Sequence, residues 1–113
     1  IFLDDAAGLM TIHLEIACPD SCARMKEFQT SDAAVRAGCI VFSDTKDPHR
    51  LIIDIGFPGY KNGYTGSIEL GSFLASPVKT SGMIAPDTEK TLLRDTKNQP
   101  LGIEGTTTVR VER

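Results

Sequence analysis

Two carboxylates have a spacing that suits acid–base chemistry. Asp54 and Glu69 lie on opposite arms of an expected β-hairpin over residues 51–74, where they share one face as diagonal neighbours. Sheet geometry places their Cβ atoms roughly 6–8 Å apart, within the range used by the paired carboxyl groups of glycoside hydrolases. The alternative is a solvated polar face. We favour it because a small glycosidase would need a sugar-stacking cleft, and the chain has no tryptophan.

Cysteines and histidines are the other candidate ligands and nucleophiles. They are Cys18, Cys22, Cys39, His13 and His49. The Cys-x3-Cys spacing is uncommon for zinc, and no second paired motif follows. A nucleophile would need a base brought to it by the fold, and no G-x-S-x-G elbow is present. The sequence therefore predicts no catalytic residue, no metal and no cofactor, and it leans against an enzyme.

The odd number of cysteines leaves two redox states open. Three reduced thiols are the favoured interpretation, which slightly favours a reducing intracellular setting without establishing the compartment. The alternative is one disulfide and one free thiol. In that case Cys18 can close a small loop with Cys22, and Cys39 can take either partner.

The middle of residues 51–74 is the predicted binding surface. Asn62-Gly63 is a preferred pair for a type I′ turn, and the alternating runs on either side predict a hairpin in which Ile55 faces Leu70. Tyrosines at such a tip are amphipathic anchors of the kind found at protein and carbohydrate contacts. The predicted contact residues are Phe57, Tyr60, Lys61, Asn62 and Tyr64.

Pro58 bears on how this hairpin ends. In the expected register Pro58 lies opposite Ser67 in a non-hydrogen-bonded pair, so its missing N–H faces away from the partner arm. We therefore expect that no third strand pairs beside Pro58, and that the tip projects beyond the sheet.

The other expected elements are short. Residues 10–18 alternate as a half-buried strand, with His13 and Glu15 on the polar side. Ser31-Asp32 and Gly38 bracket a short helix over 32–37. Further strands are expected over 39–42, 78–85 and 103–112, and a strand is favoured over a helix for 87–95. An arm or short edge strand is expected over 1–8 and a loop over 43–50, while 22–29 is open between helix and strand.

Together these elements predict a mainly β domain, either an antiparallel sandwich or a barrel-like sheet with one short helix. The alternative is an α+β fold with one or two helices on one face of an antiparallel sheet. The expected core is Ile12, Leu14, Ile16, Ile40, Phe42, Leu51, Ile53, Ile55, Phe57, Ile68, Leu70, Leu74, Val109 and Val111. Residues 1–113 read as a single domain, and the start at Ile1 suggests part of a longer chain.

The net charge and the length of the apolar runs narrow the classes of partner that the domain is expected to bind. A net charge of −3 with no basic block argues against nucleic acid. The apolar runs are too short to span a bilayer, so no membrane insertion is expected. The leading hypothesis is a soluble, non-catalytic interaction module that presents the tip to a protein or glycan. The alternatives are a small glycosidase-like hydrolase that uses the carboxylate pair, and an assembly domain that forms homo-oligomers through its sheet edges.

Overall fold

A computed structural model shows that the protein is mainly β-strand. The structure describes residues 1–18, 23–77, 84–88, 90–100 and 108–112. Every strand pairing is antiparallel, and the described part contains one short helix, so the predicted fold class is confirmed. The elements are β1 (Phe2–Ala17), β2 (Ala23–Thr30), α1 (Asp32–Arg36), β3 (Ile40–Asp44), β4 (Arg50–Gly56), β5 (Tyr64–Glu69), β6 (Gly71–Pro77), β7 (Ala85–Pro86), β8 (Leu92–Asp95) and β9 (Thr108–Arg110).

β1 is the strand around which the others are arranged. Ile12 pairs with Ile55 of β4 on one side and with Leu93 of β8 on the other. Leu9 likewise lies between Tyr64 of β5 and the end of β8. β4 and β5 therefore follow one another along one edge of β1, while β7, β8 and β9 share the other edge. The N-terminal residues are half of the central strand and not the arm or short edge strand that was expected.

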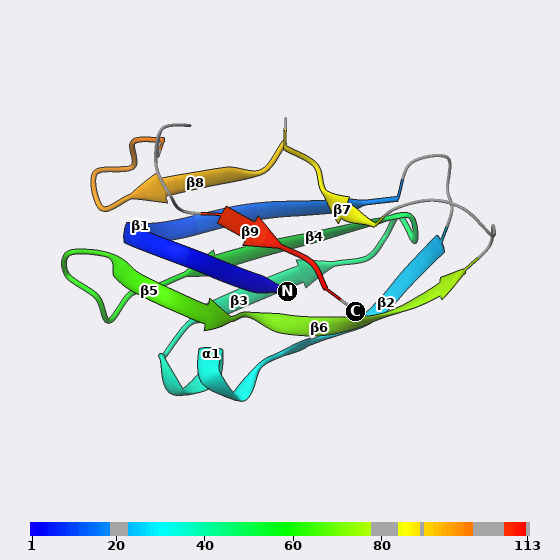
Figure 1. Ribbon diagram of the computed structural model, residues 1–113, viewed down its shortest axis with the longest axis horizontal. Helices are drawn as coiled ribbons and strands as arrows, with labels where there is room; N and C mark the ends of the chain where they lie inside the picture. Colours follow the sequence, from blue (N-terminus) through cyan, green and yellow to red (C-terminus); the bar gives the residue numbers. More distant parts are fainter. Residues whose placement is uncertain (19–22, 78–83, 89, 101–107, 113) are drawn as a thin grey trace.

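β1 folds back on itself part-way along its length (Figure 1). Asp5 and Gly8 have φ angles of +53° and +68°, and the pairing with β5 shifts register at this point. The hydroxyls of Ser67 and Thr65 accept the backbone N–H groups of Asp5 and Gly8, at 3.0 and 3.4 Å, so the bulged backbone keeps its hydrogen bonds. Strands that change layer at bulges are typical of packed β-sheets.

The two halves of β1 lie in different layers (Figure 1). The front layer holds the first half of β1 with β5 and β9, and the chain continues from β5 into β6, which pairs with β2. The back layer holds the second half of β1 with β8, β4 and β3. Among the described strands β3 pairs with β4 alone, so the back layer is open at β3 and the arrangement is sandwich-like, not a closed barrel.

The hairpin predicted over 51–74 is wrong in its pairing and right in its reversal of direction. The chain turns over residues 57–63, and β4 and β5 run in opposite directions in Figure 1. Each of them pairs with β1, not with the other. Gly63 has a φ angle of +80° but Asn62 does not have a positive φ, so the type I′ turn is absent. The connection is an arch between the two layers.

The core lies between the layers, and alternation predicted most of it. The predicted core residues that are buried are Ile12, Leu14, Ile16, Leu51, Ile53, Ile55, Phe57 and Leu70. Ile40, Phe42 and Leu74 are exposed, so their assignment to the core is wrong. Ile40 and Phe42 point outward because the alternation of β3 turns Val41 toward the core. Ile68, Val109 and Val111 are half-buried against it.

The remaining predictions fare unevenly. The helix is confirmed: the Ser31 hydroxyl accepts the Ala34 N–H at 3.0 Å, and Gly38 follows the helix with a φ of +74°. The described residues of the open segment 22–29 belong to strand β2, which runs on to Thr30, and β3 extends two residues into the loop expected over 43–50. Strands occur within 87–95 and 103–112 as β8 and β9, whereas 78–83 and 101–107 lie outside the described residues. No helix in the described part is long and apolar enough to cross a membrane.

Candidate functional site

The outer face of the back layer carries two neighbouring rows of side chains that cross four strands. In each row the residues of β3, β4, β1 and β8 stand directly opposite one another, so all the side chains share one face. The first row is Phe42, Asp54, His13 and Leu92. The second row is Ile40, Gly56, Thr11 and Arg94.

Gly56 leaves a hollow at the centre of these rows. A Cβ atom at this position would meet no atom within 4 Å, and the hollow has a volume of about 420 Å³. This volume is at the small end of the range for ligand sites. Ile40 and Phe42 stand on one side and Leu92 on the other, with exposed fractions of 50%, 69% and 43%. We call this feature the Gly56 hollow.

Five charged side chains of alternating sign extend from the hollow along the same face. The imidazole of His13 contacts Asp54 Oδ1 through Nδ1 at 2.7 Å and Glu15 Oε2 through Nε2 at 2.9 Å. Arg50 Nη1 donates to Glu15 Oε1 at 3.1 Å and to Asp87 Oδ2 at 3.0 Å. Because both ring nitrogens face carboxylates, the protonated form of His13 can donate to both of them. The contacts with Glu15 and then Asp54 raise the pKa of His13, and the contact with His13 lowers the pKa of Glu15.

This arrangement is poorly suited to acid–base or nucleophilic catalysis. A histidine that activates a nucleophile needs one free ring nitrogen, and both nitrogens of His13 are taken by carboxylates. Burial raises the pKa of the Cys39 thiol, which opposes formation of the reactive thiolate. Across the residues that the structure describes, no group of three or more histidine, cysteine, aspartate or glutamate side chains is placed to hold a metal ion.

The carboxylate pair expected from the hairpin does not form. Asp54 stands opposite His13, on the second half of β1. Glu69 stands opposite Phe2, on the first half of β1, and so belongs to the other layer. The diagonal contact required β4 and β5 to pair with each other, and this pairing is absent.

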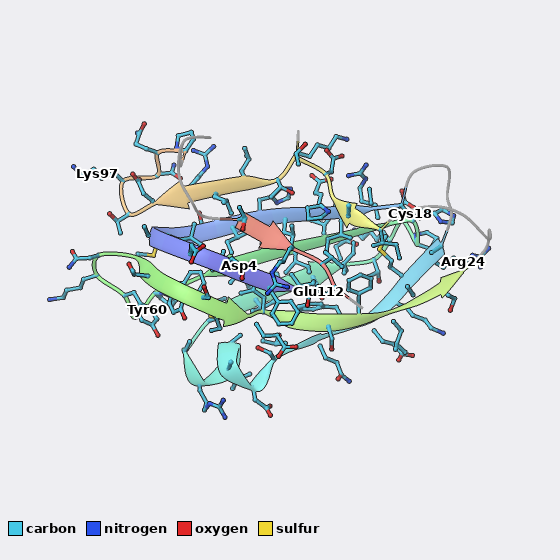
Figure 2. The ribbon with its side chains drawn as sticks, viewed as in Figure 1. Asp4, Cys18, Arg24, Tyr60, Lys97 and Glu112 are labelled. Atoms are coloured by element: carbon cyan, nitrogen blue, oxygen red, sulfur yellow. The ribbon has the colours of Figure 1, made fainter. Side chains whose placement is uncertain are left out.

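The predicted tip packs onto the body of the protein. Phe57 is fully buried and stacks on Tyr64 with ring centroids 4.9 Å apart, while Tyr60 meets both rings edge-on. Figure 2 shows Tyr60 in this loop, at the left-hand end of the molecule. Burial raises the pKa of Tyr64. Lys61 and Asn62 are exposed. Phe57 therefore supports the loop from beneath, and Tyr60, Lys61, Asn62 and Tyr64 stay predicted contacts.

The backbone of this loop is anchored on β1 at both ends, and the loop extends past the bend of β1 in Figure 1. The Phe57 N–H donates to the Met10 carbonyl at 3.0 Å, immediately before Pro58. A Cβ atom on Gly63 would lie 2.2 Å from the carbonyl carbon of Gly8, so the two backbones are in close approach. Pro58 and Phe57 also line the Gly56 hollow, so the loop adjoins that site.

The cysteines are in the state given as the alternative, with one disulfide and one free thiol. Cys18 is disulfide-bonded and Cys39 is a free thiol. The interpretation of three reduced thiols is therefore wrong. Cys18 lies at the opposite end of the molecule from Tyr60 (Figure 2), and neither Cys18 nor Cys39 lines the Gly56 hollow.

Of the residues that line the hollow, the sequence predicts polar faces for Thr11, His13 and Asp54 but assigns Ile40 and Phe42 to the core, and it does not bring these residues together. Thr11 and His13 lie on the polar side of the strand over 10–18, and Asp54 lies on the polar face of 51–57, as predicted. These residues come together only because β1 pairs with β4. In that pairing His13 lies opposite Asp54, which is 41 positions away in the sequence. Gly56 carried a visible signal, since it is a glycine at the end of a strand that contains three isoleucines.

No protein-family model, no curated protein and no solved structure matches this chain. Its function is therefore inferred from the residues of the hollow and their surroundings.

The contacts of His13 predict a pH dependence of stability. Because the pKa of His13 is raised above 6.5 in the folded state, its contribution to stability is complete below about pH 6.5 and is lost as the pH rises through the folded-state value. Because the pKa of Glu15 is lowered below 4.5, its contribution is complete above about pH 4.5 and is lost on acidification. The cluster is therefore expected to stabilise the fold most between these values.

Thermal unfolding between pH 6 and pH 9 measures the histidine contribution. We expect the wild type to lose less than about 1 kcal/mol over this interval, because His13 is more than a third exposed and water screens its ion pairs. The His13→Gln variant should lose less stability than the wild type over the same interval. If His13→Gln loses as much stability as the wild type between pH 6 and pH 9, protonated His13 does not stabilise the sheet.

Proposed function

We propose that this domain is a non-catalytic binding module whose contact surface is the Gly56 hollow with the adjoining loop, and whose partner is a protein segment. The observation that carries the proposal is the set of apolar side chains left exposed around a hollow: Ile40, Phe42 and Leu92. Concave, mostly apolar surfaces with a few polar groups at the margin are the usual form of ligand sites. Clustered exposed apolar side chains commonly mark contact surfaces.

A protein ligand is favoured over a glycan. Sugar rings are bound against open aromatic faces, and the hollow offers one exposed ring, that of Phe42, since the rings of Tyr60 and Tyr64 pack against each other and against Phe57. The small-hydrolase alternative loses its support, because Asp54 and Glu69 pair with different halves of β1. The exposed aliphatic and aromatic groups around the hollow suit an apolar side chain of a polypeptide.

Self-association through β3 is the second candidate function. The outer edge of β3 has no partner among the described strands, and Ile40-Val41-Phe42-Ser43 carries neither the lysine nor the proline that commonly blocks such edges. Two copies that pair through this edge would extend the back layer. Light scattering over a range of concentrations decides the point, and a monomer at every concentration would remove this candidate.

Filling the hollow tests the leading proposal. Gly56→Val places a β-branched side chain over the hollow, where a Cβ atom meets nothing within 4 Å and the backbone φ is not positive. Peptides selected on the wild type from a phage-displayed random library should bind this variant at least about tenfold more weakly, as expected for a blocked central pocket. The stability of the variant should match or exceed that of the wild type.

Ala75→Val is the matched control, because it places a valine at an exposed strand position of β6, away from the hollow, where the native side chain makes no hydrogen bond. Selected peptides should bind this variant as they bind the wild type. Equal affinity for Gly56→Val and the wild type would contradict the proposal, as would a library selection that yields no peptide. A glycan array probed with the wild type tests the disfavoured ligand class, and sugar binding that survives Gly56→Val would overturn the choice of surface.

A further inference from the structure

We infer that the occupant of the Gly56 hollow is an extended peptide segment that carries an apolar side chain between a basic and an acidic residue. This inference rests on the proposed function and adds the chemistry of the ligand. Asp54 and Arg94 both line the hollow and stand at diagonally opposite corners of the block that β4, β1 and β8 form in the two rows, with Thr11 and His13 of β1 between them. Their opposite charges define the two ends of the ligand.

Asp54 supplies the acidic corner. Its side chain is 56% exposed, and its Oδ1 contacts His13. The alternating cluster that it begins has three carboxylates against two cations when His13 is protonated, so it carries a net charge of −1. Asp44 lies on the same face of β3 and adds a further negative charge. This corner therefore attracts a basic group on a ligand.

Arg94 supplies the basic corner. Its Nη1 donates to the carbonyl oxygen of Asn98 at 2.9 Å, which is a neutral acceptor. Arg94 forms no ion pair with any carboxylate among the described residues. Its charge is thus uncompensated and half-buried beside the hollow, where an acidic ligand group would meet little competition from other side chains.

The spacing of the two corners matches an extended chain. Asp54 and Arg94 are two strands and two residues apart, which corresponds to about 12 Å between their Cβ atoms. In an extended peptide the side chains at i, i+2 and i+4 share one face, and i to i+4 spans about 13–14 Å. A Lys-x-Phe-x-Glu segment would set its lysine at Asp54 and its glutamate at Arg94, with its phenylalanine above Thr11 and His13, against the side chains that line the hollow.

The test uses three capped, fluorescent pentapeptides: Lys-Ser-Phe-Ser-Glu, Lys-Ser-Phe-Ser-Lys and Glu-Ser-Phe-Ser-Glu. Peptides of uniform charge are the proper comparison, because a reversed mixed sequence meets the same corners when it binds in the opposite direction. At low ionic strength the mixed peptide should bind the wild type about fivefold or more tightly than either uniform peptide. Arg94→Glu should reverse this preference toward Lys-Ser-Phe-Ser-Lys.

Lys97→Glu is the control for Arg94→Glu. It makes the same change of charge in the exposed turn after β8 and does not line the hollow (Figure 2). Its peptide preference should remain that of the wild type. The ligand inference is overturned if the uniform peptides bind the wild type as tightly as the mixed one, if Arg94→Glu leaves the preference unchanged, or if the mixed peptide does not bind at millimolar concentration.

These failures are distinguishable from failure of the proposed function. If peptides bind without regard to charge and Gly56→Val still weakens them, the hollow remains the contact surface and the charge rule falls. If Gly56→Val weakens none of the library-selected peptides, the contact surface itself is wrong and both conclusions fall.

Discussion

Replacing Gly63 by alanine is expected to lower the free energy of unfolding by about 3 kcal/mol or more. Gly63 has a φ angle of +80°, a conformation that strains any residue with a Cβ atom. The new methyl group would also lie 2.2 and 2.4 Å from the carbonyl carbon and oxygen of Gly8. These are backbone atoms inside the bulge of β1, so they cannot rotate aside as a side chain would. The arch and the bulge must separate.

Urea unfolding measures this loss, and Gly59→Ala is its control. Gly59 lies in the same loop, has no positive φ, and a Cβ atom there would meet nothing within 4 Å. We expect Gly59→Ala to stay within about 0.5 kcal/mol of the wild type. A Gly63→Ala curve that coincides with the wild-type curve would contradict the packing of the arch on β1 and would favour the projecting hairpin.

Truncating Phe57 is expected to cost about 3–5 kcal/mol, the usual loss for a phenylalanine in a packed core. Phe57 has no exposed surface and joins the rings of Tyr60 and Tyr64 to the core. Alanine at this position would leave a cavity between the arch and the sheet. The exposed Phe42 gives a matched control, because Phe42→Ala removes the same group from a side chain that is 69% exposed.

We expect Phe42→Ala to cost less than about 1 kcal/mol. The same pair of variants separates stability from binding, since Phe42 stands beside the Gly56 hollow and Phe57 supports the arch from below. Equal losses of stability in the two variants would mean that Phe42 belongs to the core, as the apolar run over 39–42 predicted. Unimpaired peptide binding by Phe42→Ala would count against the hollow.

Alternation of side chains predicted the faces of the strands well. The buried positions of 10–18 and 51–57 follow the period of two, because burial depends on which face of a strand is turned inward and not on which strand lies beside it. The core prediction for the apolar run over 39–42 failed because this run shows no such alternation. Ile40, Val41 and Phe42 are all apolar, so the run contains no polar residue to indicate the outer face, and β3 lies at an open edge of its layer.

Pairing between strands was not predictable to the same degree. Asn62-Gly63 and the alternating runs around it indicate a local hairpin, and the chain does reverse there. The arms pair instead with the two halves of β1, a long-range arrangement made possible by the bulges at Asp5 and Gly8. Neither bulge carries a recognisable motif, although Gly8 is a residue that bulges often use.

The candidate site depends on this long-range pairing, which is why sequence reasoning missed it. The hollow exists because Gly56 stands opposite both Ile40 and Thr11, and the charged cluster exists because His13 stands opposite Asp54. These pairings join three separate stretches of the chain. The carboxylate pair failed for the converse reason, since it assumed that β4 and β5 were neighbours.

The most direct test of the account is a map of where a library-selected peptide binds. Titration of the ¹⁵N-labelled domain should shift the backbone amide signals around the Gly56 hollow. The strongest changes are expected at Thr11, His13, Phe42, Asp54, Gly56, Leu92 and Arg94. Changes confined to Lys61 and Asn62 would place the contact on the exposed loop, and changes confined to β2 and β6 would place it on the other sheet. Either result would contradict the hollow as the binding surface.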